Sequence, residues 1–93
     1  MSKKNWVAID ISGIEPGDEI QQSKILMEFP TEDEAIAYAK KKTDFVDDGS
    51  MYSETWVGQR GDLHEFQSGE GYNIGVCRED DLKEMAEFAV RNF

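Results

Sequence analysis

The sequence predicts an α+β fold, a two-layer sandwich with two helices packed on one face of a mostly antiparallel sheet of four or five strands. Short segments of alternating apolar residues, separated by turn residues, are typical of antiparallel strands. One helical segment with a capping signal lies among these strands, and a second, amphipathic segment ends the chain. Because each apolar helix stripe needs a sheet to cover it, this element order favours a layered arrangement.

The first two strands are predicted from alternation. Residues 6–11 put Val7 and Ile9 on one face and Ala8 on the other, and residues 23–29 alternate in the same way. The intervening residues 12–18 contain Gly-rich and Pro-Gly turn chemistry.

The first helix is predicted over residues 32–42. Thr31 is a typical N-cap, and Glu34 stands three residues later, as in a capping box. Acidic residues open the segment and Lys40–Lys42 close it, so both ends complement the helix dipole.

Three further strands and a helix are expected after a loop rich in Asp and Gly. The strands span residues 52–57, 63–66 and 72–77, with turns at Arg60-Gly61-Asp62 and at residues 68–71. The last helix carries one apolar stripe with helical spacing: Leu82, Met85, Ala86, Ala89, Val90 and Phe93. With both helices on one face, the other face is expected to be partly bare and to carry some of Trp6, Tyr52, Trp56 and Tyr72.

Length and composition predict a single domain, residues 1–93, in the cytoplasm. The chain has 93 residues, and no apolar run approaches the roughly 20 residues that span a bilayer. Cys77 is the only cysteine, so no internal disulfide is expected, and a reducing compartment is the simplest location.

The charge balance limits the kinds of partner that can be expected. Twenty acidic residues against ten basic ones give a formal net charge of -10. Direct binding to nucleic acid or to an anionic membrane is therefore not expected, because both need a basic surface. The acidity favours either solubility through self-repulsion or a protein partner with a basic surface.

Catalytic and cofactor chemistry lacks the residues it usually needs. His64 and Cys77 are single residues of their kind, so a zinc site would have to be built largely from carboxylates, which is unusual for zinc. No metal, no cofactor and no enzymatic activity are expected. A small enzyme or ligand-binding subunit around His64 and Cys77 is an alternative, and weak calcium binding around Asp44 and Asp48 is left open.

The expected function is that of a small acidic binding protein, in its narrower form an inhibitor that imitates nucleic acid and occupies a basic groove of a partner enzyme, as in phage defence. Seven acidic residues are not explained by helix capping. Together with Trp56 they form the predicted partner site: Asp44, Asp47, Asp48, Glu54, Trp56, Asp62, Glu65 and Glu70. The alternative is a binding module or homodimer that uses an aromatic sheet face around Tyr52 and Trp56, with Phe88 as a further anchor.

One short run bears on imitation of nucleic acid. Residues 22–32 combine a strand pattern with an acidic helix start. This run resembles the corresponding stretch of the phage uracil-DNA glycosylase inhibitors, a family that imitates DNA. The resemblance covers this run alone, and it assigns no functional residue.

Overall fold

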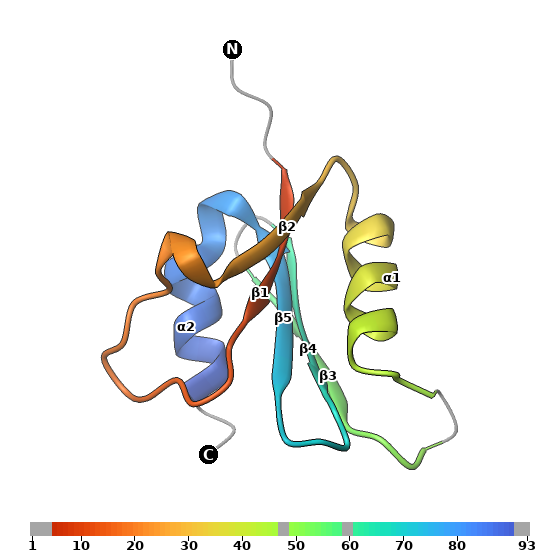
Figure 1. Cartoon of the computed structure of the whole chain (residues 1–93). Coiled ribbons are helices and arrows are strands. Elements are labelled where there is room, and N and C mark those ends of the chain that lie inside the picture. The colour runs from red at the N-terminus through yellow and green to blue at the C-terminus, as the bar shows by residue number, and fades with distance from the viewer. Residues whose placement is uncertain (1–4, 47–48, 59–60, 91–93) are drawn as a thin grey trace.

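The structure, a computed structural model, describes residues 5–46, 49–58 and 61–90. Within these ranges a five-stranded antiparallel sheet is combined with two α-helices, so the predicted α+β class and antiparallel sheet are confirmed (Figure 1). The elements are β1 (Trp6–Asp10), β2 (Ile25–Phe29), α1 (Glu32–Lys42), β3 (Ser53–Val57), β4 (Asp62–Gln67), β5 (Asn73–Arg78) and α2 (Leu82–Val90), with short 3₁₀ turns before β2 and α2.

Element boundaries follow the sequence pattern to within two residues. The first helix has the predicted bounds, and Thr31 caps it by accepting a hydrogen bond from the backbone N–H of Glu34 at 3.3 Å. Asp47 and Asp48 of the predicted partner site, Arg60 of the predicted turn and Phe93 of the predicted stripe lie outside the described residues.

The strand order in the sheet is β2-β1-β5-β4-β3, and every neighbouring pair is antiparallel. The first and last strands of the chain pair at the centre, where Trp6 faces Arg78 and Asp10 faces Ile74. The edges are therefore β2 and β3, which come from the middle of the sequence.

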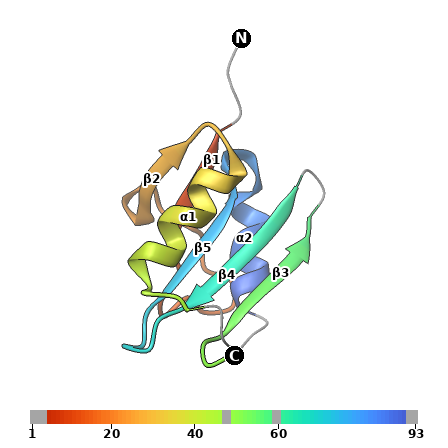
Figure 2. The same ribbon diagram turned by 90° about the vertical axis from the view of Figure 1, so that its right-hand side faces the viewer.

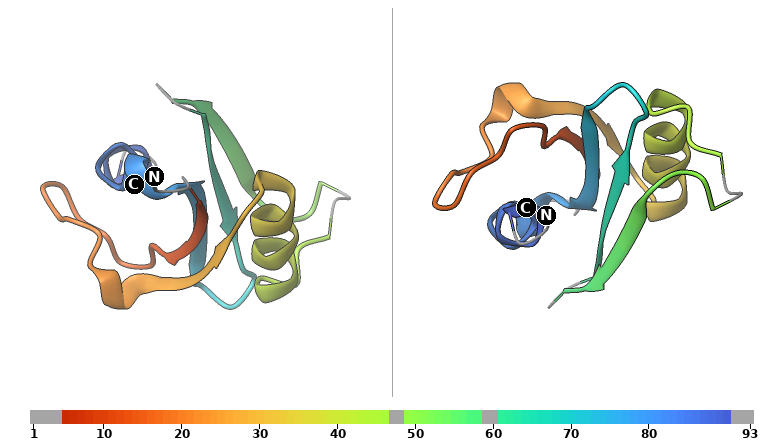
Figure 3. Two further views of the ribbon diagram at one scale, coloured as in Figure 1. Left: turned by 90° about the horizontal axis from the view of Figure 1, so that it is seen from above. Right: turned by 90° about the horizontal axis from the view of Figure 1, so that it is seen from below.

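The two helices lie on opposite faces of the sheet, which corrects the prediction that they share one face. Figure 3 shows α1 on one side of the curved sheet and α2 on the other. The buried side chains separate in the same way: Ala35 and Ala39 of α1 pack with one cluster of sheet residues, and Met85 and Ala89 of α2 pack with another.

The reason lies in the central strand β1, which is apolar on both faces. Val7 and Ile9 pack on the α2 side, whereas Trp6 and Ala8 pack on the α1 side, and all four are at most 7% exposed. A strand of this kind is stable only when both of its faces are covered. Trp6 is therefore a core residue and does not belong to a bare sheet face.

Both helices are short. In the described part of the chain, α1 has 11 residues and α2 has 9, and no helix there has the length and apolar character needed to cross a bilayer.

Candidate functional site

The edge strand β3 carries the main concentration of exposed apolar side chains. Tyr52, immediately before the strand, is 40% exposed, Trp56 is 43% exposed, and Val57 is 78% exposed. Figure 2 shows β3 at the edge of the sheet, beyond the part that α1 covers. Large exposed apolar side chains gathered on one short strand are a frequent mark of an interaction site.

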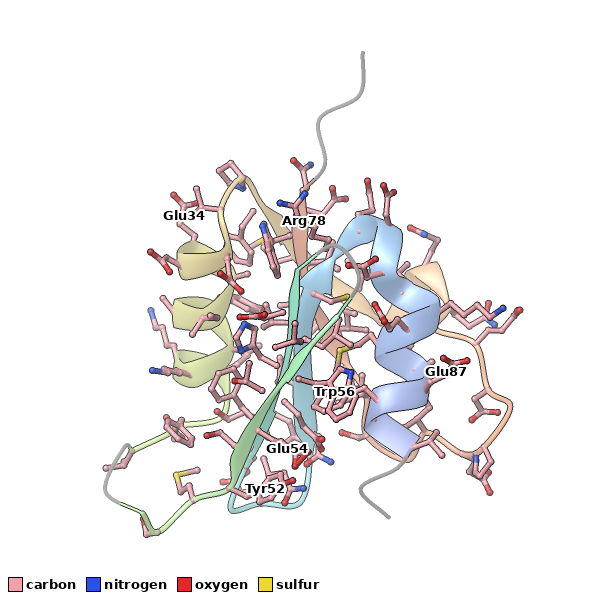
Figure 4. All side chains as sticks on the ribbon, turned by 180° about the vertical axis from the view of Figure 1, so that it is seen from behind. Glu34, Tyr52, Glu54, Trp56, Arg78 and Glu87 are labelled. Atoms are coloured by element: carbon pink, nitrogen blue, oxygen red, sulfur yellow. The ribbon has the colours of Figure 1, made fainter. Side chains whose placement is uncertain are left out.

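Alternation along β3 places Tyr52, Glu54 and Trp56 on the α2 side of the sheet (Figure 4). The Tyr52 hydroxyl donates a hydrogen bond to Glu54 Oε1 at 3.1 Å. The Trp56 ring stacks on Phe88 of α2, with ring centroids 6.5 Å apart. These three side chains, together with Val57, are called the β3 strip below.

Acidic charge is concentrated beneath the β3 strip. Glu54 pairs across the strands with Glu65 of β4, which is 1% exposed. The Oε2 atom of Glu54 is buried and has no hydrogen-bond partner among the described residues. Carboxylates placed directly opposite each other repel. Gln67 Nε2 donates a hydrogen bond to Glu65 Oε2 at 3.5 Å, so the atom that favours a nearby cation or hydrogen-bond donor is Oε2 of Glu54.

The backbone of β3 is also available along its outer edge. The carbonyl of Tyr52 and the N–H of Gly58 bond to the β4 side, to Gln67 and Gly61. In an antiparallel strand alternate residues direct their backbone groups inward and outward, so those of Ser53, Thr55 and Val57 point away from the sheet. Within the described residues β3 is the last strand on this side, and it contains neither lysine nor proline, the residues that commonly protect an edge.

A second cluster lies on the α1 side. His64 of β4 is 8% exposed, and its Nε2 lies 2.8 Å from Oε2 of Glu32, the first residue of α1. Its Nδ1 lies 3.0 Å from the hydroxyl of Thr55 on β3. A carboxylate oxygen of Asp62 completes a group of three ligand-type atoms that lie within 4.8 Å of one another. His64 is therefore buried, because α1 covers this part of β4.

Two pockets lie elsewhere, next to the β1–β2 connection. The larger, of about 580 Å³, is lined on its apolar side by Ile20, Leu82, Ala86 and Val90, between this connection and α2. The smaller, of about 360 Å³, lies along residues 10–24. His64 lines neither of these two pockets.

The predicted acidic site is not one continuous surface. Glu54 and Trp56 come together on the α2 side, whereas Asp62 lies in the His64 cluster on the α1 side. Asp44 is exposed at the end of α1, and Glu70 is exposed in the β4–β5 turn. Glu65 is buried, so its place on an acidic surface is a wrong prediction, because both strand neighbours and α2 enclose that face of β4.

Two further predicted residues belong to the core. Phe88, the proposed extra anchor, is 2% exposed and packs with Leu63 and Met85, so it cannot contact a partner directly. Cys77 is fully buried, as expected of a small core residue. Burial raises the pKa of the Cys77 thiol, and the nearby charges of Asp81 and Glu84 raise it further, so this thiol is not an activated nucleophile.

Sequence reasoning missed Val57, Thr55 and Glu32. A period-two reading of Asp62 and His64 predicts that they share one face of a strand, but only the strand register brings Thr55 opposite His64. Glu32 reaches His64 because α1 packs across the sheet, which no local signal reveals.

Comparisons with protein-family models, with curated proteins and with solved structures found no match to this chain, so the site is defined by its own geometry.

Proposed function

We propose that this protein is a non-enzymatic binding protein that takes up an extended, basic segment of a protein partner along β3. The observation that carries the proposal is the β3 strip itself, an outermost strand with exposed apolar side chains at Tyr52, Trp56 and Val57. The proposal joins the acidic and the aromatic interpretations of the sequence in one surface.

Backbone pairing supplies the first part of the affinity. An extended peptide can add a strand to a sheet edge, and its main chain then bonds to the outward groups of the existing strand. The outward groups of Ser53, Thr55 and Val57 offer such a ladder. Exposed, uncharged residues at Thr55 and Val57 leave the approach to this edge open.

Side chains supply selectivity. An added strand places alternate side chains on the α2 side, against Tyr52 and Trp56, where aromatic rings are effective interface anchors. The carboxylate of Glu54 and the net charge of -10 favour lysine or arginine in the incoming segment. A basic partner is also steered toward an acidic protein over long distances at low salt.

Imitation of nucleic acid is the narrower form of this proposal. The net charge of -10 supports it. Imitation of a phosphate backbone requires charges in a continuous row. The separation of Glu54 from Asp44, Asp62 and Glu70 therefore argues against this narrower form. The distinguishing result is displacement of DNA or RNA from a captured partner when this protein is added.

The test is an affinity capture from cell lysate with the tagged protein at low and high salt, comparing wild type with Val57→Lys. Val57 is 78% exposed, so the substitution should leave the fold intact while it adds a charge of the wrong sign to the edge. We expect wild type to capture partners that the Val57→Lys variant does not capture. We also expect wild type to capture these partners less well at high salt.

Leu26→Lys is the matched control, since Leu26 is an exposed apolar residue of β2 at the opposite edge. This variant makes the same change of net charge and should retain the partners. Equal loss of partners from both variants would show that net charge alone matters, and equal retention would rule out β3 as the binding edge.

A further inference from the structure

The cluster of Glu32, Asp62 and His64 has the composition of a metal site. It offers one imidazole nitrogen and two carboxylate groups, and the three ligand atoms lie within 4.8 Å of one another. We propose that this cluster binds a divalent transition-metal ion of the zinc type. The proposal is independent of partner binding on β3.

Two elements, β4 and α1, bring the three ligands together. Asp62 and His64 are two residues apart on β4, so they share its α1 face, and Glu32 approaches from the first turn of α1. Bonds of roughly 2.0–2.2 Å in a tetrahedral arrangement place ligand atoms about 3.4 Å apart. Glu32 and Asp62 are half-buried, so their carboxylates have room to rotate by the small amount that closes the site.

The histidine is already oriented for a metal. Its Nδ1 contacts the Thr55 hydroxyl, which directs Nε2 toward the carboxylate of Glu32. Metal-bound histidines typically use one ring nitrogen as ligand and donate a hydrogen bond from the other. A neutral ring whose Nε2 binds the metal carries its single proton on Nδ1, so Nδ1–H donates to the Thr55 oxygen and the hydroxyl rotates to accept it.

The donor set decides the class of ion. Imidazole nitrogen suits zinc, iron, nickel and copper, whereas calcium and magnesium prefer oxygen ligands alone. The helix dipole gives the start of α1 the equivalent of about half a positive charge, which opposes the binding of a cation. Glu32, Asp33, Glu34 and Asp62 carry more negative charge than this, so the local field favours a cation.

The test uses the full chain without an affinity tag, titrated with Zn²⁺ by calorimetry and by proton NMR. His64 is the only histidine, so its two ring C–H signals are unambiguous reporters. The expected result is 1:1 binding that shifts both signals. Absence of binding, or binding that leaves the His64 signals unchanged, would overturn the proposal.

Variants locate the ion. Glu32→Gln, Asp62→Asn and His64→Gln should each weaken Zn²⁺ binding by about tenfold or more, and Thr55→Val should weaken it through the loss of its contact with Nδ1. Asp33→Asn is the matched control, because Asp33 is exposed in the same first turn and is outside the cluster.

Circular dichroism of each variant confirms its fold, and the half-exposed positions Glu32 and Asp62 keep the test decisive if His64→Gln does not fold. Unchanged affinity in Glu32→Gln and Asp62→Asn would place the ion elsewhere and overturn the proposal, as would an equal loss of affinity in Asp33→Asn.

Discussion

Trp56 lies against Phe88, with ring centroids 6.5 Å apart and ring planes inclined by 30°. Trp56, on the edge strand, is 43% exposed, whereas Phe88, on the core-facing side of α2, is 2% exposed. The β3 strip is therefore an outward continuation of the hydrophobic core. A partner that covers Trp56 would extend this core across the sheet edge.

Trp56→Ala is expected to lower the free energy of unfolding by about 1–3 kcal/mol, since it removes the aromatic pair and part of a large buried surface. Urea denaturation monitored by circular dichroism measures the change. Val57→Ala is the control, because Val57 is 78% exposed and should change stability by no more than about 0.5 kcal/mol. Equal stability of the Trp56 variant and wild type would show that the ring pair contributes nothing to folding.

Gly58→Ala is expected to destabilise the end of the β3–β4 hairpin. A Cβ atom at Gly58 would lie 2.6 Å from the carbonyl oxygen of Gly61 and 2.8 Å from Oε1 of Glu84. Because the first contact is with backbone, the hairpin itself must shift, at a cost of about 1–3 kcal/mol. The same urea measurement gives the value.

Gly69→Ala is the matched control for this substitution. A Cβ atom there meets no heavy atom within 4 Å, and the backbone of Gly69 does not have a positive φ. Its stability should equal or slightly exceed that of wild type, since alanine restricts the unfolded chain. A similar loss in both variants would contradict the steric explanation.

Glu32 and His64 are expected to be energetically coupled even without a metal. Their 2.8 Å contact joins α1 to β4, but Glu32 is 34% exposed in its side chain, so solvent screens the pair. A double-mutant cycle with Glu32→Gln and His64→Gln, measured in a chelator, should give a coupling of about 0.5–1 kcal/mol. A coupling of zero would mean that the contact does not persist in solution.

The sequence predicts the elements of this fold well because most signals are local. Alternation identifies the strands, and the Thr31 cap with its acidic first turn identifies α1. The placement of the helices was not predictable in the same way. The alternation of residues 6–9 predicts one buried face and one bare face, whereas each face is covered by its own helix.

The candidate sites depend on long-range geometry to a greater extent. The strand pattern predicts Tyr52 and Trp56 on a bare sheet face, whereas they lie on the α2 side and are exposed because β3 is at the sheet edge. The position of β3 at that edge follows from the pairing of β1 with β5. The sequence predicts Glu65 as a surface acid, and only strand packing shows that it is buried.

Cys77 is expected to lower the free energy of unfolding as the pH becomes alkaline. In the folded state, burial and then the charges of Asp81 and Glu84 raise the pKa of its thiol. In the unfolded chain the thiol has an ordinary pKa of about 8.5. Above that pH the unfolded state binds fewer protons than the folded state, so this contribution to stability is full at pH 7 and declines as the pH rises. The decline approaches about 1.4 kcal/mol per pH unit.

Urea denaturation between pH 7 and pH 10 tests this dependence by comparing wild type with Cys77→Ala. Above about pH 8.5 the free energy of unfolding should fall more steeply for wild type than for Cys77→Ala, because only wild type has the thiol. All other titrating groups are shared, so their effects cancel in the difference. A thiol reagent should also modify native Cys77 far more slowly than the unfolded chain, since the buried thiol keeps its proton. Parallel pH profiles together with rapid modification of the native protein would show that the thiol is accessible to solvent and ionises in the folded state.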